Sequence, residues 1–311
     1  MRICAAVLTA ALPACSSLGF FVANAPVPFG SFTRSLGLPY GEDARQRLDV
    51  FSPGAGRHPV VVFFYGGAWT TGEKSQYAFV GAALAAHGYV TVIPDYRLYP
   101  QVRFPEFIAD GARAVAWVRQ HAHEFGGDSA RIVLMGHSAG AHMAAMLALN
   151  DEYLAKAGVS GHSIVGLIGM SGPYTLVPNS DTLNAIFTNP YMPEDWQPVR
   201  FASGRAPPTL LLQGADDAVV SARQTQEMYD ALQSHGVRVE SHVYPKRGHA
   251  DTIASFSLVA RLRTPALHET LTFLRSVTAD DRRKLGRTDR VGEQIKGHQY
   301  ARDPIGSGEG G

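Results

Sequence analysis

Cysteine is almost absent from this chain: its 311 residues include two, Cys4 and Cys15. Because both lie at the start of the chain, no disulfide bond can hold the rest of it together, and a buried hydrophobic core has to do so. An excess of charge of one sign is missing as well. The formal net charge is +1, which gives no electrostatic reason to expect binding to nucleic acid or to an anionic surface.

Long apolar runs are also missing, and the one apolar run near the start, residues 3–12, is short and follows Arg2. A basic residue before such a run is typical of a secretory signal peptide. The letters LPAC over 12–15 resemble the bacterial lipobox, although Pro13 stands where a small residue is usual. We therefore expect residues 1–14 to be removed and Cys15 to receive a diacylglyceryl group. The exported protein would then be a membrane-anchored bacterial lipoprotein of the periplasm or cell surface.

Two alternatives to the lipoprotein remain, an ordinary signal peptide cleaved nearby and an apolar N-terminal helix. The rest of the composition is that of a folded protein, with 45% hydrophobic and 18% charged residues. Residues 15–40 are rich in Pro, Gly, Ser and Phe, which predicts a tether leading into the domain. Residues 41–278 suffice for one large domain. Residues 279–311 have too few apolar side chains to offset the entropy of ordering, which predicts a disordered tail.

Within the predicted domain, short apolar runs alternate with helical patterns such as the one over 105–123. This alternation predicts an α/β fold with a mostly parallel central sheet, helices on both faces and no separate cap domain. Ligands in such sheets bind at the carboxyl ends of the strands, so residues just after a strand are the candidates for chemistry. The predicted strands are 60–64, 90–94, 131–135, 163–168, 209–212 and 237–243.

A G-x-S-x-G pentapeptide over 136–140 directly follows one of these strands and opens an apolar helical pattern. Its two glycines permit the sharp strand-to-helix turn that lifts a serine hydroxyl clear of the sheet. The turn also places Ser138 at a helix N-terminus, where developing negative charge is favoured. The strand–turn–helix context therefore predicts Ser138 as a nucleophile.

A serine hydroxyl is a weak nucleophile unless a base takes its proton and an acid orients that base. Asp217 comes after the strand 209–212, and His249 lies on a loop after the strand 237–243. This is the order of serine, acid and histidine expected after such a turn. We predict Ser138, Asp217 and His249 as the catalytic residues. Asp216 is the alternative acid, and a turn or N-cap role is the alternative for Asp217.

A tetrahedral intermediate needs hydrogen-bond donors for its oxyanion. The letters YGGAW over 65–69 follow the strand 60–64 and resemble the His-Gly-Gly-Gly oxyanion motif of esterases. We expect the amides of Gly67, Ala68 and Ala139 to be the donors, and a glycine turn beside a packed tryptophan is the alternative. Trp69, and Tyr174 in the aromatic-rich connection 171–206, are candidates for the wall of a substrate pocket. Packing is the alternative for both.

The other polar residues near these motifs have structural interpretations. Arg97, in the letters DYR over 95–97, is expected to pair with a carboxylate such as Asp110 in a structural loop. His137 and His142, beside the nucleophile, are expected to pack rather than to act as second bases. No metal site is predicted, because three further histidines have no partners at a metal-ligand spacing: His121, His123 and His242.

Together these motifs resemble the esterase/lipase branch of the α/β-hydrolases, which includes hormone-sensitive-lipase-like carboxylesterases, feruloyl-esterase-related enzymes and kynurenine formamidase. A closer likeness is to prenylcysteine methylesterases. It covers roughly residues 40–276 and rests on RLDVF over 47–51, GGAW over 66–69, DYR over 95–97 and GGD over 126–128. The resemblance implies the α/β-hydrolase fold and hydrolysis of a carboxylic ester without a metal or cofactor. It leaves the substrate open.

The predicted function is therefore acyl transfer from a small-molecule ester to Ser138 and then to water, with no nucleic-acid partner. An amidase of the formamidase type, or a peptidase, on the same three residues is one alternative. A lipid-anchored binding protein that has lost its chemistry is an alternative from another class, and the complete set of serine, aspartate and histidine argues against it. The acyl chain, the alcohol and the oligomeric state are not predicted.

Overall fold

The structure is a computed structural model that describes residues 18–160 and 163–279. The chain divides into two units, Met1–Val277 and Thr278–Gly311, and all elements named below lie in the first apart from the last residue of α10. The predicted signal peptide, Cys15 and residues 280–311 of the predicted tail lie outside the described residues. The proposed processing and the tail therefore stay predictions.

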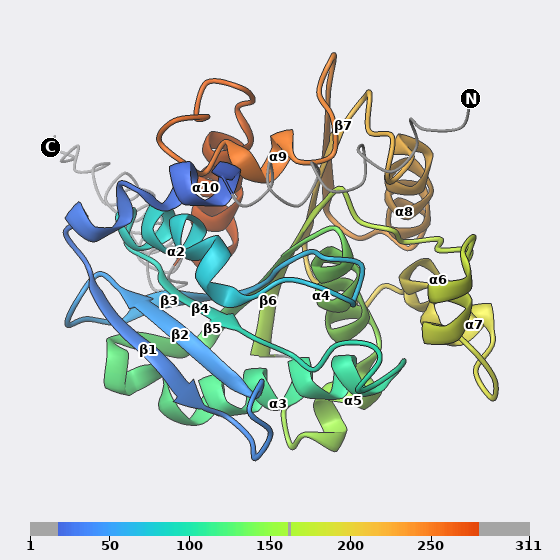
Figure 1. Ribbon diagram of the computed structural model, residues 1–311, viewed down its shortest axis with the longest axis horizontal. Helices are drawn as coiled ribbons and strands as arrows, with labels where there is room; N and C mark the ends of the chain where they lie inside the picture. The colour runs from blue at the N-terminus through green and yellow to red at the C-terminus, as the bar shows by residue number, and fades with distance from the viewer. Residues whose placement is uncertain (1–17, 161–162, 280–311) are drawn as a thin grey trace, which may run out of the picture. The chain divides into compact units, whose positions relative to one another are not determined.

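A single eight-stranded sheet forms the centre of the described chain (Figure 1). Its strand order is β1-β2-β4-β3-β5-β6-β7-β8. The pairs β1/β2 and β2/β4 are antiparallel, and every later pair is parallel. The strands are β1 (Thr33–Pro39), β2 (Arg47–Ser52), β3 (His58–Phe64), β4 (Val90–Pro94), β5 (Gly127–His137), β6 (Ile164–Met170), β7 (Thr209–Gly214) and β8 (Val239–Tyr244).

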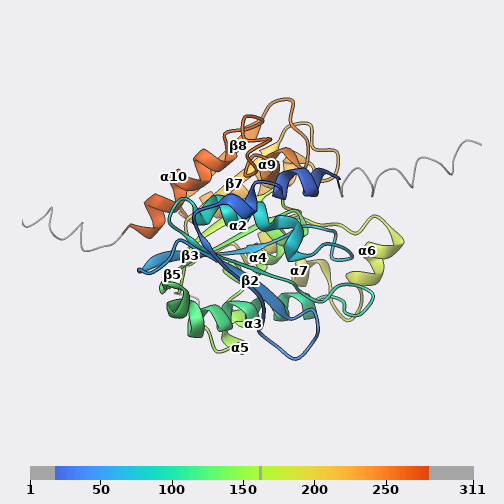
Figure 2. The same cartoon turned by 60° about the vertical axis from the view of Figure 1, so that its left-hand side comes forward.

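Helices cover both faces of this sheet. Figure 2 shows α2 and α10 on one side and α3 and α5 on the other, where α4 packs against α3. The α-helices are α2 (Ala78–Ala85), α3 (Glu106–His121), α4 (Ala139–Leu149), α5 (Asp151–Lys156), α6 (Asp181–Ile186), α7 (Pro193–Trp196), α8 (Ala222–Ser234), α9 (Asp251–Ala254) and α10 (Ala266–Thr278). Short 3-10 helices are η1 (Val27–Phe29), η2 (Lys74–Tyr77), η3 (Ala122–Phe125) and η5 (Pro198–Phe201). A further short helix spans residues 18–24.

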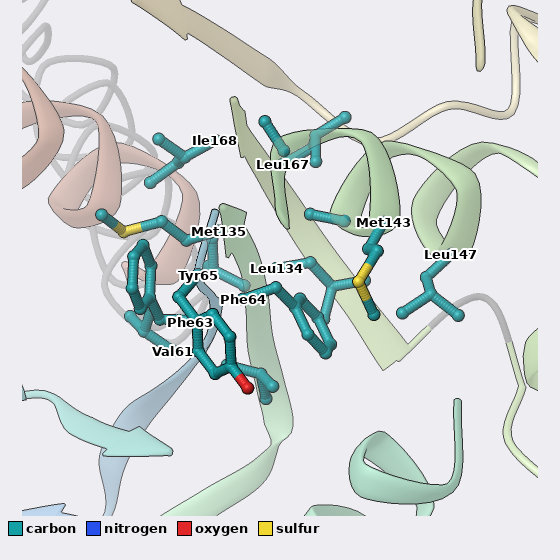
Figure 3. Packing of buried hydrophobic residues seen from close by; sticks show 14 of the residues in the cluster. Val61, Phe63, Phe64, Tyr65, Leu134, Met135, Met143, Leu147, Leu167 and Ile168 are labelled. Atoms are coloured by element: carbon teal, nitrogen blue, oxygen red, sulfur yellow. The ribbon is translucent and has the colours of Figure 1, made fainter. Parts of the chain in front are cut away.

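The core is built on the central strands β3 and β5, whose apolar runs Val60–Phe64 and Ile132–Met135 are fully buried. Because a parallel strand is covered on both faces, its side chains are apolar without alternation. Figure 3 shows Phe64 and Leu134 pointing toward Met143 and Leu147 of α4, whereas Phe63 and Met135 point to the opposite face. This packing fixes the end of β5 and the start of α4, between which Ser138 lies.

The predicted fold class is confirmed: the sheet is mostly parallel, with helices on both faces. All six predicted strands are present, and the predicted helix 105–123 corresponds to α3 followed by η3. Two strands were not predicted, β2 and the edge strand β1, and β1 lies within the predicted tether 15–40. Glycine and proline are uncommon in strands, so Gly37 and Pro39 obscure the strand pattern of β1 in the sequence.

Candidate active site

Ser138 lies on a strained turn between β5 and α4, with φ 56° and ψ −122°. A residue with a side chain adopts such a conformation only at a cost of roughly 1–3 kcal/mol. The two glycines of the pentapeptide are required by close backbone contacts. A Cβ on Gly136 would lie 2.1 Å from the Gly140 carbonyl oxygen, and one on Gly140 would lie 2.0 Å from that of Phe64. The turn therefore depends on glycine at both positions and lifts the Ser138 side chain from the sheet.

The structure brings Ser138, His249 and Asp217 together in one chain of hydrogen bonds. His249 Nε2 lies 2.9 Å from Ser138 Oγ, and His249 Nδ1 lies 2.8 Å from Asp217 Oδ2. The three residues come from the ends of β5, β8 and β7, and they are separated by as many as 111 positions in the sequence. With Nδ1 donating to Asp217, Nε2 presents its lone pair to the Ser138 hydroxyl.

The side chain of Asp217 is buried, and its carboxylate accepts further hydrogen bonds besides that of His249. The Val219 and Val220 amides donate to Oδ1 at 2.9 and 2.8 Å, and Gln213 Nε2 donates to Oδ2 at 2.9 Å. Burial by itself would raise the pKa of this carboxyl, but the hydrogen bonds from His249 and the two amides outweigh it and lower the pKa to about 2. The alternative acid, Asp216, is exposed on the surface.

The predicted oxyanion donors lie on a glycine turn that packs against Ser138. A Cβ on Gly66 would stand 3.0 Å from that of Ser138. The next residues have positive φ, 135° at Gly67 and 51° at Ala68. Among the described residues nothing accepts a hydrogen bond from the amides of Gly67, Ala68 or Ala139. Unpaired amides on both sides of a serine are the feature that an oxyanion site requires.

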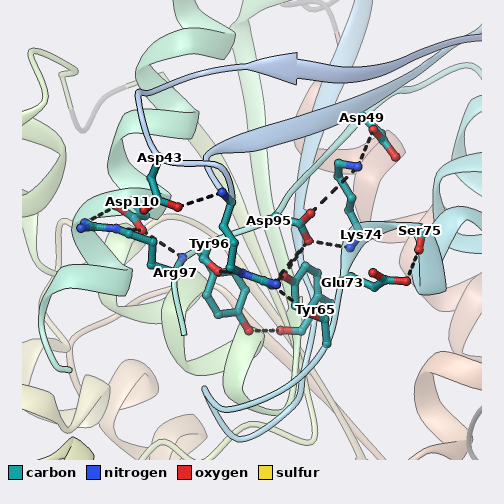
Figure 4. Close-up of polar contacts among 12 residues, drawn as sticks. Asp43, Asp49, Tyr65, Glu73, Lys74, Ser75, Asp95, Tyr96, Arg97 and Asp110 are labelled. Carbon is teal, nitrogen blue, oxygen red and sulfur yellow. Dashed lines mark hydrogen bonds and ion pairs between the residues drawn. The ribbon is translucent and has the colours of Figure 1, made fainter. Parts of the chain in front are cut away.

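Asp95 and Arg45 form hydrogen bonds with the residues on either side of this glycine turn (Figure 4). The Tyr65 hydroxyl donates to Asp95 Oδ1 at 2.8 Å, and Arg45 Nη2 donates at 2.8 Å to both the Tyr65 hydroxyl and the Gly72 carbonyl. The Tyr96 hydroxyl donates to the Tyr65 carbonyl at 2.9 Å. Both ends of the turn are thus tied by hydrogen bonds, one to the buried Tyr96 and the other to the partly buried Arg45. The sequence analysis did not predict this network, because its members are far apart in the chain.

Asp110 anchors the neighbouring loop, as predicted for a carboxylate paired with Arg97. Arg97 Nε and Nη2 donate to its two oxygens at 2.8 and 2.7 Å. Arg113 Nη1 and Gln46 Nε2 donate to Oδ1 at 2.9 and 2.8 Å. Because four donors compensate the buried carboxylate, the interpretation of this loop as structural is confirmed (Figure 4).

His137 does more than pack beside the nucleophile. Its Nε2 lies 3.0 Å from the His249 carbonyl oxygen, and the Ser171 hydroxyl donates to the same oxygen at 3.3 Å. Burial, with the neighbouring His249 imidazole, lowers the pKa of His137 to about 3, so the ring is neutral and Nε2 carries its proton. The only sequence signal for this contact was the position of His137 next to Ser138.

Trp69 and Tyr174, the predicted pocket residues, lie in the core, where they are 2% and 1% exposed. Trp69 packs edge-on against His142 and Phe187, at ring-centroid distances of 5.1 and 4.8 Å. His142 Nε2 in turn lies 2.6 Å from the Trp196 carbonyl oxygen. These contacts are those of packing residues, which was the alternative interpretation.

The described part of the chain contains no group of three or more His, Cys, Asp or Glu residues placed to hold a metal ion. None of the helices described is long and apolar enough to cross a membrane.

Comparison with solved structures identifies the class of fold. The chain resembles esterase 2 of Thermogutta terrifontis with a TM-score of 0.66 and 23% identity, over 81% of this chain and 95% of that one. It resembles esterase B of Lactobacillus rhamnosis with a TM-score of 0.73 and 18% identity, over 92% and 95% of the two chains. At these identities the likeness concerns the fold alone, and the fold is that of the α/β-hydrolases.

The family is shown by sequence. A family profile described as BD-FAE matches residues 48–232, which is more than half of the chain. The chain belongs to this family. It is also 32% identical over 238 residues to isoprenylcysteine alpha-carbonyl methylesterase of Arabidopsis thaliana, and 31% identical over 262 residues to esterase LipC of Mycobacterium tuberculosis. These alignments cover 69% and 76% of this chain, and 56% and 64% of the two relatives. The predicted relationship to carboxylesterases is confirmed.

Proposed function

We propose that this protein hydrolyses carboxylic esters with Ser138 as nucleophile, His249 as general base and Asp217 as the orienting acid. The observation that carries this proposal is the unbroken hydrogen-bond chain from Ser138 Oγ through His249 to Asp217, at 2.9 and 2.8 Å. The strained turn at Ser138 supports it, because such strain persists where it serves chemistry. The names of the relatives, which are esterases and methylesterases, support the choice of an ester.

The first half of the reaction acylates the serine. His249 Nε2 takes the hydroxyl proton as Ser138 Oγ attacks the ester carbonyl, and the buried carboxylate of Asp217 stabilises the imidazolium. The amides of Gly67, Ala68 and Ala139 donate to the oxyanion as its charge develops. His249 then gives the proton to the leaving alkoxide, so the alcohol departs and an acyl-enzyme remains.

The second half releases the acid. A water molecule takes the place of the alcohol, loses a proton to His249 Nε2 and attacks the acyl carbonyl. The same amides stabilise the second tetrahedral intermediate, which collapses when His249 returns the proton to Ser138 Oγ. Each step needs only His249, which takes up or returns one proton, and the backbone amides that donate to the oxyanion. The residues described above therefore suffice for the whole cycle.

Turnover of p-nitrophenyl esters tests this function. Ser138→Ala should lower the hydrolysis of p-nitrophenyl acetate and butyrate by roughly 10⁴-fold or more, with an unchanged melting temperature. Asp216→Asn is the matched control and should keep wild-type turnover. Retained turnover in Ser138→Ala would contradict the assignment. Faster hydrolysis of acyl anilides than of the matching esters would favour an amidase on the same residues.

We further propose that Cys15 carries a lipid anchor that holds the exported protein on a membrane. The support is the lipobox-like LPAC over 12–15, after a short apolar run. Cys15→Ser should allow sodium carbonate to extract the protein from membranes, whereas the lipid-anchored wild type should resist this extraction, and globomycin should block its maturation. Membrane association that survives extraction with sodium carbonate in the Cys15→Ser protein would contradict the anchor.

A further inference from the structure

The short helix over residues 18–24 is apolar on its outer face as well as its inner one. Its inner face is attached to the domain, because the Phe20 ring packs 5.1 Å from that of Tyr77 and Asn24 Nδ2 donates to the Gln76 carbonyl at 2.9 Å. On the outer face Phe21 is 73% exposed, with Leu18 and Val22 beside it, and Phe29 of η1 is 87% exposed. A surface helix normally turns polar residues outward, so this face is unusual for a side open to water.

A second exposed apolar segment, residues 258–262, lies between α9 and α10. It carries Leu258, Val259 and Leu262 outward, and Leu262 is 99% exposed. Arg261 and Arg263 flank this leucine. Arg263 Nε is paired with Asp251 of α9, whereas Arg261 has no ion-pair partner among the described residues. A leucine that is almost completely exposed buries no apolar surface in the folded chain, so its side chain does not stabilise the fold.

The two segments are neighbours in space although they are more than 200 positions apart. Figure 1 and Figure 2 both show the N-terminal segment beside α9. Both segments line the same hollow of about 730 Å³, to which Leu18, Val22, Val259 and Arg263 contribute. The inner wall of this hollow includes His137 and Ala250, the neighbours of Ser138 and His249 in the sequence. The hollow therefore reaches residues that adjoin Ser138 and His249 in the sequence.

Exposed apolar side chains are concentrated on this side of the molecule. Of the twelve exposed large hydrophobic side chains among the described residues, six belong to the two segments and a seventh, Phe29, belongs to η1, which follows the first segment in the sequence. A concentration of exposed apolar side chains of this kind is typical of a binding surface. We call it the apolar surface, and it consists of Leu18, Phe21, Val22, Phe29, Leu258, Val259 and Leu262.

We propose that the apolar surface docks on a lipid bilayer and places the catalytic residues at the membrane interface. Apolar side chains with arginines beside them suit this boundary, since the side chains enter the acyl region and the guanidinium groups meet the lipid phosphates. The inference also rests on the proposed lipid anchor at Cys15, which would bring this surface close to a membrane. Leu18 stands three residues after Cys15, and three residues span at most about 11 Å.

Flotation with lipid vesicles tests this docking separately from the lipid anchor. The full-length Cys15→Ser protein, which lacks the anchor, is mixed with vesicles of 70% phosphatidylcholine and 30% phosphatidylglycerol. We expect it to float with the vesicles, and Phe21→Asp with Leu262→Asp in the same background to lower the bound-to-free ratio at least tenfold. Val177→Asp with Met192→Asp is the matched control, because these exposed apolar residues lie outside the apolar surface, and it should float like the parent.

Hydrolysis of dissolved p-nitrophenyl acetate should be equal in the parent and in both double variants, which shows that the chemistry is intact. A failure of docking is thus distinguishable from a failure of the proposed function. The proposal is overturned if the parent stays in the soluble fraction, if the Phe21/Leu262 variant floats like the parent, or if the control loses binding equally. A dimer in sedimentation velocity that Leu262→Asp dissociates would assign the apolar surface to self-association instead.

Discussion

The proposed base, His249, is held at both its side chain and its backbone. Asp217 accepts from Nδ1, and His137 and Ser171 donate to the carbonyl oxygen. A general base that is misplaced by about 1 Å can lose on the order of 10²-fold in rate. We therefore expect the neutral His137 ring to position His249, and its place next to Ser138 links the proposed nucleophile to the proposed base.

His137→Leu removes the hydrogen bond to the His249 carbonyl, whereas His137→Gln keeps an Nε2 donor. We expect kcat for p-nitrophenyl butyrate to fall roughly 10- to 100-fold in the leucine variant, with KM nearly unchanged, and to recover in part in the glutamine variant. The rate of inactivation by a fluorophosphonate should follow the same order. Equal kcat in both variants and the wild type would exclude a positioning role.

The low pKa of Asp217 predicts a pH dependence of stability. Its pKa is lowered from 3.8 to about 2, so the carboxylate stabilises the folded state above pH 3.8, and this stabilisation is lost as the pH falls toward 2. The full stabilisation by this carboxylate is about 2 kcal/mol, and about 1 kcal/mol of it is lost when the pH falls to 3. Urea unfolding at pH 6 and pH 3 should therefore show a smaller loss of stability in Asp217→Asn than in the wild type. The exposed control Asp216→Asn should behave like the wild type, and a loss as large in Asp217→Asn would contradict the low pKa.

At the scale of elements, the site is an assembly of strand ends and a glycine turn. The turn after β3 has to keep its amides unpaired beside Ser138, and the Tyr65 hydroxyl bonded to Asp95 and Arg45 holds it there. Burial raises the pKa of the Asp95 carboxyl, although hydrogen bonds from Tyr65 and the Lys74 amide oppose the effect. Removing one donor would therefore leave a buried acceptor poorly satisfied.

Tyr65→Phe should destabilise the protein by about 1–3 kcal/mol, because buried partners lose a hydrogen bond. It should also lower kcat more than it raises KM, since the loosened turn holds the oxyanion donors less well. Tyr229→Phe on α8 is the control, because within the described part of the chain its hydroxyl accepts only from the neighbouring Gln233, and both quantities should stay at wild-type values. If Tyr65→Phe lowers stability but leaves kcat unchanged, the turn does not depend on this hydroxyl.

Much of this architecture was predictable from sequence, for a physical reason. Buried parallel strands are continuous apolar runs, and the residues just after them, such as Ser138, Asp217 and His249, gather at one edge of the sheet. What the sequence did not reveal depends on long-range contacts or on weak local patterns. The edge strand β1 contains Gly37 and Pro39, the contact of His137 with His249 joins residues 112 apart, and the burial of Trp69 and Tyr174 depends on rings from other elements.

At the scale of the whole molecule, the N-terminal segment joins the domain through a few polar contacts. Asn24 donates to Gln76 and accepts from the Phe79 amide at 2.9 Å each. These bonds hold the helix 18–24 against η2 and α2, with its apolar outer face toward solvent. The N-terminal part of the proposed membrane surface is thus attached by one asparagine together with the ring contact of Phe20 with Tyr77.

Asn24→Ala should free the helix from the domain, because the Phe79 amide and the Gln76 carbonyl lose their partner. We expect faster amide hydrogen exchange confined to residues 18–29 and 75–79, and weaker flotation with the vesicles described above. The turnover of dissolved p-nitrophenyl acetate should not change. Unchanged exchange in these two segments would show that the ring contact of Phe20 with Tyr77 alone holds the helix.

The most direct test of the proposed chemistry is to find the residue that a fluorophosphonate modifies. The reagent phosphonylates a serine whose hydroxyl is activated by a neighbouring base, so mass spectrometry of the digested protein should find one adduct, on Ser138. His249→Ala should slow the labelling by several orders of magnitude, and Ser138→Ala should abolish it. An adduct on another serine, or labelling of Ser138 that is as fast without His249 as with it, would contradict the central claim.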